Sequence, residues 1–268
     1  GFGAGASVFM GTIETPLLVR PYLASMQRGE LFAIMTCVMA TVAGTVMVAF
    51  AALVEPVVPG ALGHILVASV TSVPAALVVA HLMIPVAAQD STELPAVHSE
   101  ADGNLDALMR GTSDGTRIAL DIAGTIIVLL AQVHVLNAVI GLIPLEQPAT
   151  VQGLAGQLMR PLVWLMGIPW SETAVAGEYM GVKTVMNEFV AYIQLGASGG
   201  EGLSERSRLI LMYALCGFAN LGSVGIVVGG LNSVLPERRR EVAELCLKAL
   251  VAGTLATMMT GALIGALG

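Results

Sequence analysis

Long apolar stretches are the feature of this sequence that most constrains its fold. A helix needs about 20 mostly apolar residues to cross the hydrocarbon core of a bilayer. Several stretches reach that length, and Leu31–Val54 does so without a single charged residue. The candidate spans are Leu31–Val54, Leu62–Ala88, Ile118–Ile143, Leu209–Leu231 and Val242–Leu267. They predict an all-α polytopic membrane protein with transmembrane helices.

The composition excludes an ordinary soluble domain and a nucleic-acid binder. Hydrophobic residues make up 56% of the 268 residues and charged residues only 12%, whereas soluble domains contain about a quarter charged residues. The net charge is −7, and no long run of Lys or Arg offers a surface for nucleic acid. Cys37, Cys216 and Cys246 lie in apolar stretches without the spacing of a zinc or redox site, so we interpret them as buried packing residues.

Two regions fit no simple span. Gly1–Tyr22 has a short apolar half, the polar turn Gly11–Pro16, and another short apolar half. Val151–Gln194 repeats this on a larger scale, with breaks at Gly167–Pro169 and at Glu188. Irregular backbone at membrane depth is tolerated only against protein or a watery cavity. We therefore predict two re-entrant helical hairpins, each next to a binding site.

The distribution of basic residues predicts the topology. If Arg20 and Arg28 are cytoplasmic, threading five spans with the second hairpin entering from outside places Arg206 and Arg208 on the other side. The bases placed inside are Arg20, Arg28, Arg110, Arg117, Arg238, Arg239 and Arg240, as the positive-inside rule requires. The polar stretch Gln89–Arg117 cannot span, and its later part, Leu105–Arg117, is predicted to be an interfacial helix.

An inverted repeat follows from this threading. Residues 1–88 read as a hairpin with Glu14, a span broken by small polar residues at Ala40–Val46, and a final span. Residues 146–268 read as a hairpin with Glu188, a span broken at Ala219–Val224, and a final span. Residues 89–145 supply the interfacial segment and a connecting span. Inverted repeats with broken helices at the site are typical of secondary transporters.

Two carboxylates in the hairpins are the first candidates for binding. A charged side chain at the bilayer centre costs about 2.5–3.5 kcal/mol, so Glu14 and Glu188 are expected to accept hydrogen bonds from a ligand's hydroxyl or N–H groups. The alternative is structural, with Lys183 neutralising Glu188. In the second broken span, Phe218, Asn220 and Ser223 stand in an otherwise apolar stretch. Hydrogen bonding between helices is the alternative role for such residues.

Successive segments of the chain resemble the concentrative nucleoside transporter family. They are VFMGTIETPLLVRPYL, MATVAGTVMVAF, ASVTSVPAALVVAHLMIP, PLVWLMGIPW, GVKTVMNEFVAY and YALCGFANLGSVGIVVGGLNSVLPERRREVAEL, in family order over nearly the whole chain. The family is longer at its N-terminus, so the resemblance implies the C-terminal transport core without the first spans. It also implies a homotrimer and an ion-coupled symport of nucleosides by alternating access.

The resemblance assigns roles at the site. Glu188, Asn220 and Ser223 match the family's ribose contacts, with Phe218 as the aromatic residue beside them. Glu14 matches a carboxylate that faces the nucleobase. Thr12 and Ile13 stand where the family usually has Gln and Thr, so the base preference of this chain is open. Val46 of the first broken span completes the candidate substrate contacts.

The same resemblance implies a possible sodium site and no other cofactor. Ser7, Met10, Thr41 and Val42 match its ligands, with Ser7 in place of the family's Asn. A shorter side chain weakens such a site, and proton coupling through Glu14 or Glu188 is the alternative.

These observations predict a transporter rather than an enzyme, because no nucleophile–base pair or nucleotide-binding loop is present in the sequence. Its expected location is a plasma membrane, such as a bacterial inner membrane. A non-transporting membrane scaffold of the same fold and a passive channel are the rival hypotheses.

Overall fold

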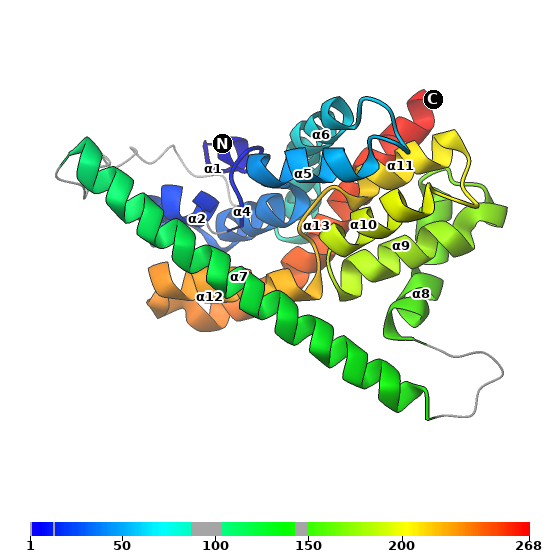
Figure 1. Cartoon of the computed structure of the whole chain (residues 1–268). Coiled ribbons are helices and arrows are strands. Elements are labelled where there is room, and N and C mark those ends of the chain that lie inside the picture. The colour runs from blue at the N-terminus through cyan, green and yellow to red at the C-terminus, as the bar shows by residue number, and fades with distance from the viewer. Residues whose placement is uncertain (1, 13, 87–102, 143–149) are drawn as a thin grey trace.

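The computed structural model describes residues 2–12, 14–86, 103–142 and 150–268, and these residues form helices and connecting segments without a β-strand. The predicted all-α class is therefore confirmed. Ile13 and part of the polar stretch after Val86 lie outside the described residues. Figure 1 shows short and long helices packed in several directions, with one long helix, α7, crossing their side.

The first third of the chain contains a short hairpin segment and the first broken span. Its helices are α1 (Phe2–Ala6), α2 (Glu14–Leu18), α3 (Arg20–Leu23), α4 (Arg28–Ala40), α5 (Gly44–Val54) and α6 (Ala61–Met83). The predicted break inside Leu31–Val54 is confirmed, since Thr41–Ala43 separate α4 from α5. This segment pairs β-branched residues with Gly44, all weaker helix formers than the flanking apolar residues.

The connecting helix differs from the prediction. An interfacial helix at Leu105–Arg117 and a separate span at Ile118–Ile143 were expected, but α7 (Asn104–Ile140) is one continuous helix of 37 residues. Polar residues of its first half such as Arg110, Thr112 and Thr116 are compatible with a helix because they stand on an exposed surface. The guanidinium of Arg110 also bonds Asp106 one turn away at 2.8 Å. Polarity therefore changes along this helix without ending it.

The second hairpin region breaks where the sequence predicted, at Gly167–Pro169 and before Glu188. It contains α8 (Val151–Leu165), the short 3-10 helix η1 (Trp170–Glu172), α9 (Thr173–Val185) and α10 (Glu188–Ser198). Helices α8 and α9 pack at backbone distance, because a Cβ added to Gly156 would lie 3.0 Å from the Cα of Glu178. Glycine contact of this kind is typical of helices in membranes. The hairpin that carries Glu188 is the pair α9–α10.

The remaining helices form the second broken span and a central helix. They are α11 (Glu205–Leu215), α12 (Leu221–Val234), the short 3-10 helix η2 (Pro236–Arg238) and α13 (Arg239–Leu267). The predicted break near Asn220 is confirmed. Helix α13 packs against α4, α6, α11 and α12, and most of its buried side chains are small, among them Ala249, Gly253 and Ala256. Both broken spans therefore pack against α13.

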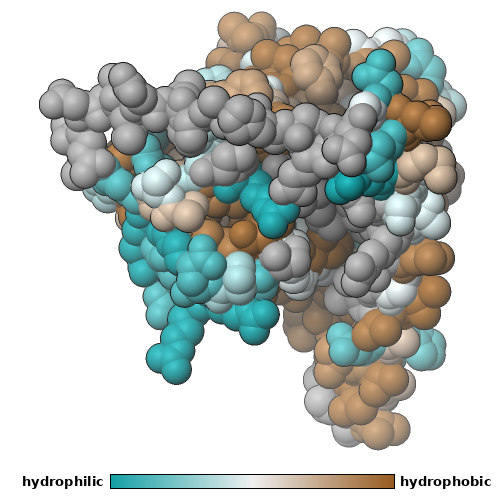
Figure 2. Space-filling view, turned by 90° about the vertical axis from the view of Figure 1, so that its left-hand side faces the viewer, coloured by the Kyte–Doolittle hydropathy of each residue, from teal (hydrophilic) through white to brown (hydrophobic). Residues whose placement is uncertain are grey.

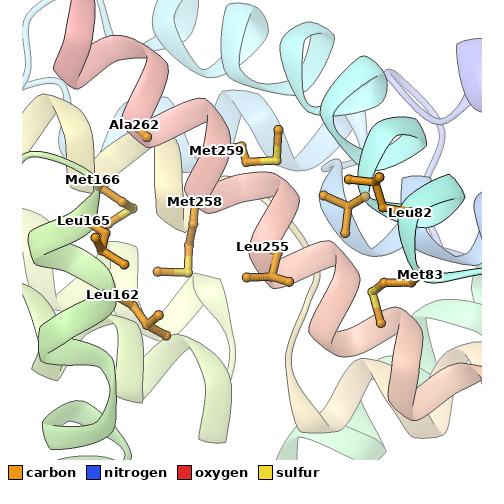
Figure 3. A pocket seen from close by; sticks show the side chains of 10 residues that line it. Leu82, Met83, Leu162, Leu165, Met166, Leu255, Met258, Met259 and Ala262 are labelled. Carbon is orange, nitrogen blue, oxygen red and sulfur yellow. The ribbon is translucent and has the colours of Figure 1, made fainter.

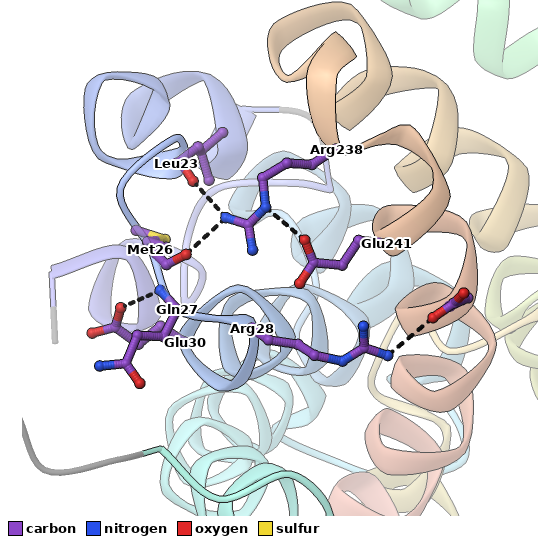
Figure 4. Close-up of polar contacts among 8 residues, drawn as sticks. Leu23, Met26, Gln27, Arg28, Glu30, Arg238 and Glu241 are labelled. Carbon is purple, nitrogen blue, oxygen red and sulfur yellow. Dashed lines mark hydrogen bonds and ion pairs between the residues drawn. The ribbon is translucent and has the colours of Figure 1, made fainter.

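Polar contacts tie the end of the first hairpin segment to the start of α13 (Figure 4). The guanidinium of Arg238 donates to the backbone carbonyls of Leu23 and Met26 at 3.1 and 2.7 Å, and it pairs with Glu241 at 2.6 Å. Arg28 at the start of α4 forms an ion pair with Glu244 at 3.1 Å. Regions more than 200 residues apart in sequence are thereby joined at one end of the molecule.

The outer surface suits a bilayer. Among the described residues, three helical segments are long and apolar enough to cross a membrane: Arg28–Val54, Ala61–Met83 and Pro236–Leu267. Large apolar side chains also face outward, such as Leu120, Ile127 and Leu142 on and beside α7. In Figure 2 the largest group of hydrophilic residues lies at the lower left, and hydrophobic residues are prominent at the top and along the right-hand side. The chain is an integral membrane protein.

Candidate functional site

The turn between α9 and α10 presents a buried carboxylate. The side chain of Asn187 accepts the backbone N–H of Val190 at 2.9 Å and so begins α10 at Glu188. Glu188 is only 5% exposed. Its position in the first turn of α10 places the carboxylate at the positive end of the helix dipole, which stabilises the charge.

The break between α11 and α12 supplies the partner of that carboxylate. Asn220 caps α12 by accepting the backbone N–H of Ser223 at 2.8 Å, and its amide donates to Glu188 at 2.8 Å. Asn220 and Ser223 are 3% and 4% exposed. Three of the residues predicted to contact ribose are therefore brought together in one buried cluster. Phe218, also predicted, is partly buried and packs on the apolar core that contains Tyr192 of α10.

One backbone hydrogen bond joins the two broken spans at their breaks. In a continuous helix the N–H of Phe218 would donate to Ala214; here it donates to the carbonyl of Thr41 at 3.2 Å. The approach requires glycine at position 217, because a Cβ there would lie 2.8 Å from the carbonyl oxygen of Ala40. The predicted breaks thus meet each other, which the sequence alone did not indicate.

The carboxylate of the first hairpin segment is placed differently. Glu14 begins α2 and is exposed. Its carboxylate lies against Gly11, since a Cβ on Gly11 would overlap it and would lie 3.4 Å from the Cβ of Ala43. Thr12 and Val46 are partly buried, and Ile13 lies outside the described residues. Glu14 therefore stands near the first break but outside the buried cluster around Glu188.

The candidate cation ligands lie on two adjoining segments. The N–H of Gly44 donates to the carbonyl of Phe9 at 2.8 Å, which holds the segment of Ser7 and Met10 against that of Thr41 and Val42. Ser7, Thr41 and Val42 are buried, and Met10 is partly buried.

The hydroxyl groups of these residues keep free acceptor capacity. Ser7 donates to the carbonyl of Ala4 at 2.8 Å and Thr41 donates to that of Cys37 at 2.9 Å. Each hydroxyl oxygen retains lone pairs that could coordinate a cation. The residues present therefore fit an oxygen-lined sodium site.

Lys183 does not pair directly with Glu188. Its side chain is fully buried, and its ammonium donates to the carbonyl of Ala214 at 2.7 Å and to the hydroxyl of Thr257 at 3.0 Å. No ion pair within 4.0 Å joins Lys183 to a carboxylate in the described part of the chain. The sequence did not predict Thr257 and the carbonyl of Ala214 as partners of Lys183, because their contact with it depends on where the helices cross.

A separate apolar cavity lies away from these residues (Figure 3). It encloses about 370 Å³ between α6, α8 and α13, and its lining includes Met83, Met166, Met258 and Met259. Its apolar side chains cannot satisfy the hydroxyl groups of a polar solute. Recognition of a polar ligand is better assigned to the cluster around Glu188.

Comparison with known proteins identifies relatives along almost the whole chain. Residues 64–265 match the family described as Na+ dependent nucleoside transporter C-terminus. The chain is 37% identical to an uncharacterized transporter, YutK, of Bacillus subtilis, over 98% of this chain and 65% of that protein. It is 35% identical to the nucleoside permease NupC of Helicobacter pylori, over 98% and 63% of the two chains.

A human protein and solved structures match as well. Solute carrier family 28 member 3 of Homo sapiens is 36% identical over 98% of this chain and 40% of its own length. A structure of CNTnw in an inward-facing substrate-bound state matches with a TM-score of 0.84 and 36% identity, over 98% of this chain and 63% of that one. A CNTnw variant in an outward-facing state matches with the same TM-score. The chain thus spans less than two thirds of the length of these relatives.

Proposed function

The chain belongs to the sodium-dependent nucleoside transporter family, and we propose that it carries nucleosides across a membrane by ion-coupled symport. Its family consists of transporters rather than enzymes. One observation supports the proposal most strongly: Glu188, Asn220 and Ser223 are gathered, buried and hydrogen-bonded, at the point where a hairpin meets two broken spans. Polar groups are retained in such a place when they bind a solute.

This cluster is chemically suited to a ribose. The Glu188 carboxylate has about four acceptor positions and shares one with the Asn220 amide. Its remaining positions can accept hydrogen bonds from two neighbouring sugar hydroxyls, and charge-assisted bonds of this kind are about twice as strong as neutral ones. The hydroxyl of Ser223 and the ring of Phe218 can complete the contact. We infer that the sugar binds in the second half of the chain.

The nucleobase is proposed to bind toward the first hairpin. Glu14, Thr12, Ile13 and Val46 are its candidate contacts. Thr12 and Ile13 cannot offer the paired donor and acceptor of a Gln side chain. We therefore expect weak discrimination between purine and pyrimidine nucleosides.

The proposed coupling ion is sodium, held by Ser7, Met10, Thr41 and Val42. The family description names Na+ dependence, and the adjoining oxygen atoms of these residues support the site. A cation moving down a potential of 100 mV releases about 2.3 kcal/mol, enough to drive accumulation. Proton coupling through Glu14 or Glu188 remains the alternative proposal.

Alternating access is proposed to act on an inverted repeat. Residues 1–88 and 146–268 would form its halves, with α2–α3 and α9–α10 as parts of two re-entrant hairpins and residues 89–145 as the connection. Related proteins solved in inward-facing and outward-facing states support such a movement. A homotrimer in a bacterial inner membrane is the proposed assembly, and the exposed apolar face of α7 needs lipid or another copy to cover it.

Counterflow of labelled uridine in proteoliposomes tests the proposal. Vesicles preloaded with unlabelled uridine should take up label faster than empty vesicles, because a carrier returns more quickly when loaded. A scaffold that has lost its substrate would give no specific uptake in either case. A passive channel would give uptake without stimulation from the other side. Either result would refute the symport proposal.

A further inference from the structure

Lys183 is a fully buried cation that has no carboxylate within 4.0 Å among the residues the structure describes. The described part of the chain contains two lysines, and the other, Lys248, is exposed on α13. An isolated ammonium in a low-dielectric interior is strongly unfavourable unless nearby acceptors and negative charge compensate it. Such a residue is expected to have a specific role where it lies.

The break in the second span creates the position that Lys183 occupies. Because the N–H of Phe218 bonds Thr41 instead of Ala214, the carbonyl of Ala214 is left without its usual helical partner. The ammonium of Lys183 takes that place at 2.7 Å. It therefore lies at the C-terminal end of α11, where the helix dipole is negative and favours a cation.

The second acceptor of the ammonium lies where the two breaks meet. Thr257 of α13 accepts at 3.0 Å. A Cβ at Gly217 would lie 2.6 Å from the methyl carbon of Thr257 and 2.8 Å from the carbonyl oxygen of Ala40. Lys183 thus bonds α9 to the second break and to the helix that packs on the first break.

Lys183 belongs to the same hairpin as Glu188 but does not occupy the acceptor positions of its carboxylate. Lys183 in the last turn of α9 and Glu188 in the first turn of α10 lie on either side of the α9–α10 turn, yet no ion pair within 4.0 Å forms between them. The carboxylate keeps its acceptor positions for Asn220 and for a ligand.

We propose that Lys183 is a tethered cation of the binding site, which supplies from within the protein the positive charge that keeps Glu188 ready to accept a nucleoside's hydroxyl groups. It is a positioning residue, since it acts through Glu188 and the end of α11. In the second half of the chain it takes the place that a dissolved cation would otherwise fill. This inference rests on the proposed function and identifies why one hairpin needs no exchangeable ion.

The test compares Lys183→Met, Lys183→Arg and the control Lys248→Met in the full-length protein. Uridine binding and uridine counterflow are measured across a range of sodium concentrations. In Lys183→Met we expect uridine to bind at least about tenfold more weakly. Raising sodium should restore binding with a steeper sodium dependence than in the wild type, because a second dissolved cation supplies the missing charge. Lys183→Arg should lie between these proteins, and Lys248→Met should match the wild type.

Two results would overturn the inference. One is wild-type uridine affinity in Lys183→Met; the other is weaker affinity with an unchanged steepness of the sodium dependence, which indicates a structural role alone. If Lys183→Met does not fold, Thr257→Val and Lys183→Arg decide, and wild-type binding in both would reject the tethered cation. A wild-type protein that shows no uridine exchange contradicts the proposed function instead, because the inference is judged on the ratio of variant to wild type.

Discussion

The two halves of the chain hold their hairpin carboxylates in opposite ways. Glu188 in the second half is buried and bonded by Asn220, and Lys183 lies on the other side of the same α9–α10 turn. Glu14 in the first half is exposed beside Gly11 and the first break. A similar pattern of hairpin and broken span thus produces one closed polar cluster and one open one.

The difference indicates which half can vary. A buried polar group that loses its partner costs about 1–3 kcal/mol, so each member of the Glu188 cluster depends on the others. An exposed group is solvated by water and tolerates replacement. Accordingly, the residues that resemble the family's ribose contacts are retained around Glu188, whereas Thr12 and Ile13 depart from its usual pattern near Glu14.

The largest difference between the two halves is expected when their hairpin carboxylates are replaced. In Glu188→Gln the shape is kept but the charge that strengthens the hydroxyl bonds is lost, at about 1.5–3 kcal/mol per bond. Uridine uptake should fall at least about tenfold at equal membrane expression. Glu14→Gln, the matched change in the open half, should reduce uptake less. Wild-type uptake in Glu188→Gln would reject the assignment of the sugar to this half.

The two hydrogen bonds of the Asn220 side chain, to Glu188 and to the N–H of Ser223, can be tested separately. Asn220→Ser keeps a side chain that can cap α12 but removes the amide that donates to Glu188, whereas Asn220→Ala removes both. We expect uptake to fall about tenfold in each, since a hydrogen bond to a charged group, worth about 1.5–3 kcal/mol, is lost. Only Asn220→Ala should also lose about 1 kcal/mol of stability through the missing cap.

Thr150→Ala is the matched control, because the Thr150 hydroxyl caps α8 by accepting the N–H of Gly153 at 3.0 Å, on a helix that carries none of the proposed substrate contacts. It should lose stability without losing uptake. Thermal melting of the purified proteins measures the cap, and uptake measures the site. Equal uptake in wild type and Asn220→Ser would show that the amide does not prepare the carboxylate.

Base discrimination in the first half is expected to increase when the family's usual residues are restored at positions 12 and 13. Thr12→Gln combined with Ile13→Thr supplies an amide and a hydroxyl that can pair with a base edge. The preference between uridine and adenosine in competition assays should change by about threefold or more, as for one added hydrogen bond. An unchanged competition profile across the common nucleosides would place the base elsewhere.

The smallest expected effect concerns the coupling ion. Ser7→Asn lengthens one oxygen ligand at the proposed sodium site and should lower the sodium concentration for half-maximal uptake by about twofold. Replacement of sodium by choline at fixed pH should abolish accumulation. If accumulation persists and disappears only with a protonophore, the coupling ion is the proton and the carboxylates become the groups to test.

Several features of the fold were predictable because their causes are local in sequence. Apolar length predicted the membrane class, and the small polar residues around Thr41 and Asn220 predicted the breaks. Glu188 was recognised because a carboxylate in an apolar segment is costly wherever the segment folds. The error at α7 has the opposite cause: the polar residues of Leu105–Arg117 suggested a boundary, but a helix continues through polar residues that stay exposed.

The sequence by itself determined that this chain enters a membrane, where its spans break, and which polar side chains in its apolar segments are candidates for binding. Only the tertiary structure decided that the breaks bond each other through Phe218 and Thr41, and that Lys183 bonds Ala214 and Thr257 rather than Glu188. The physical reason is that transfer to lipid depends on each residue's own chemistry, whereas a backbone group freed by a broken helix takes whichever partner the crossing of distant helices brings within reach.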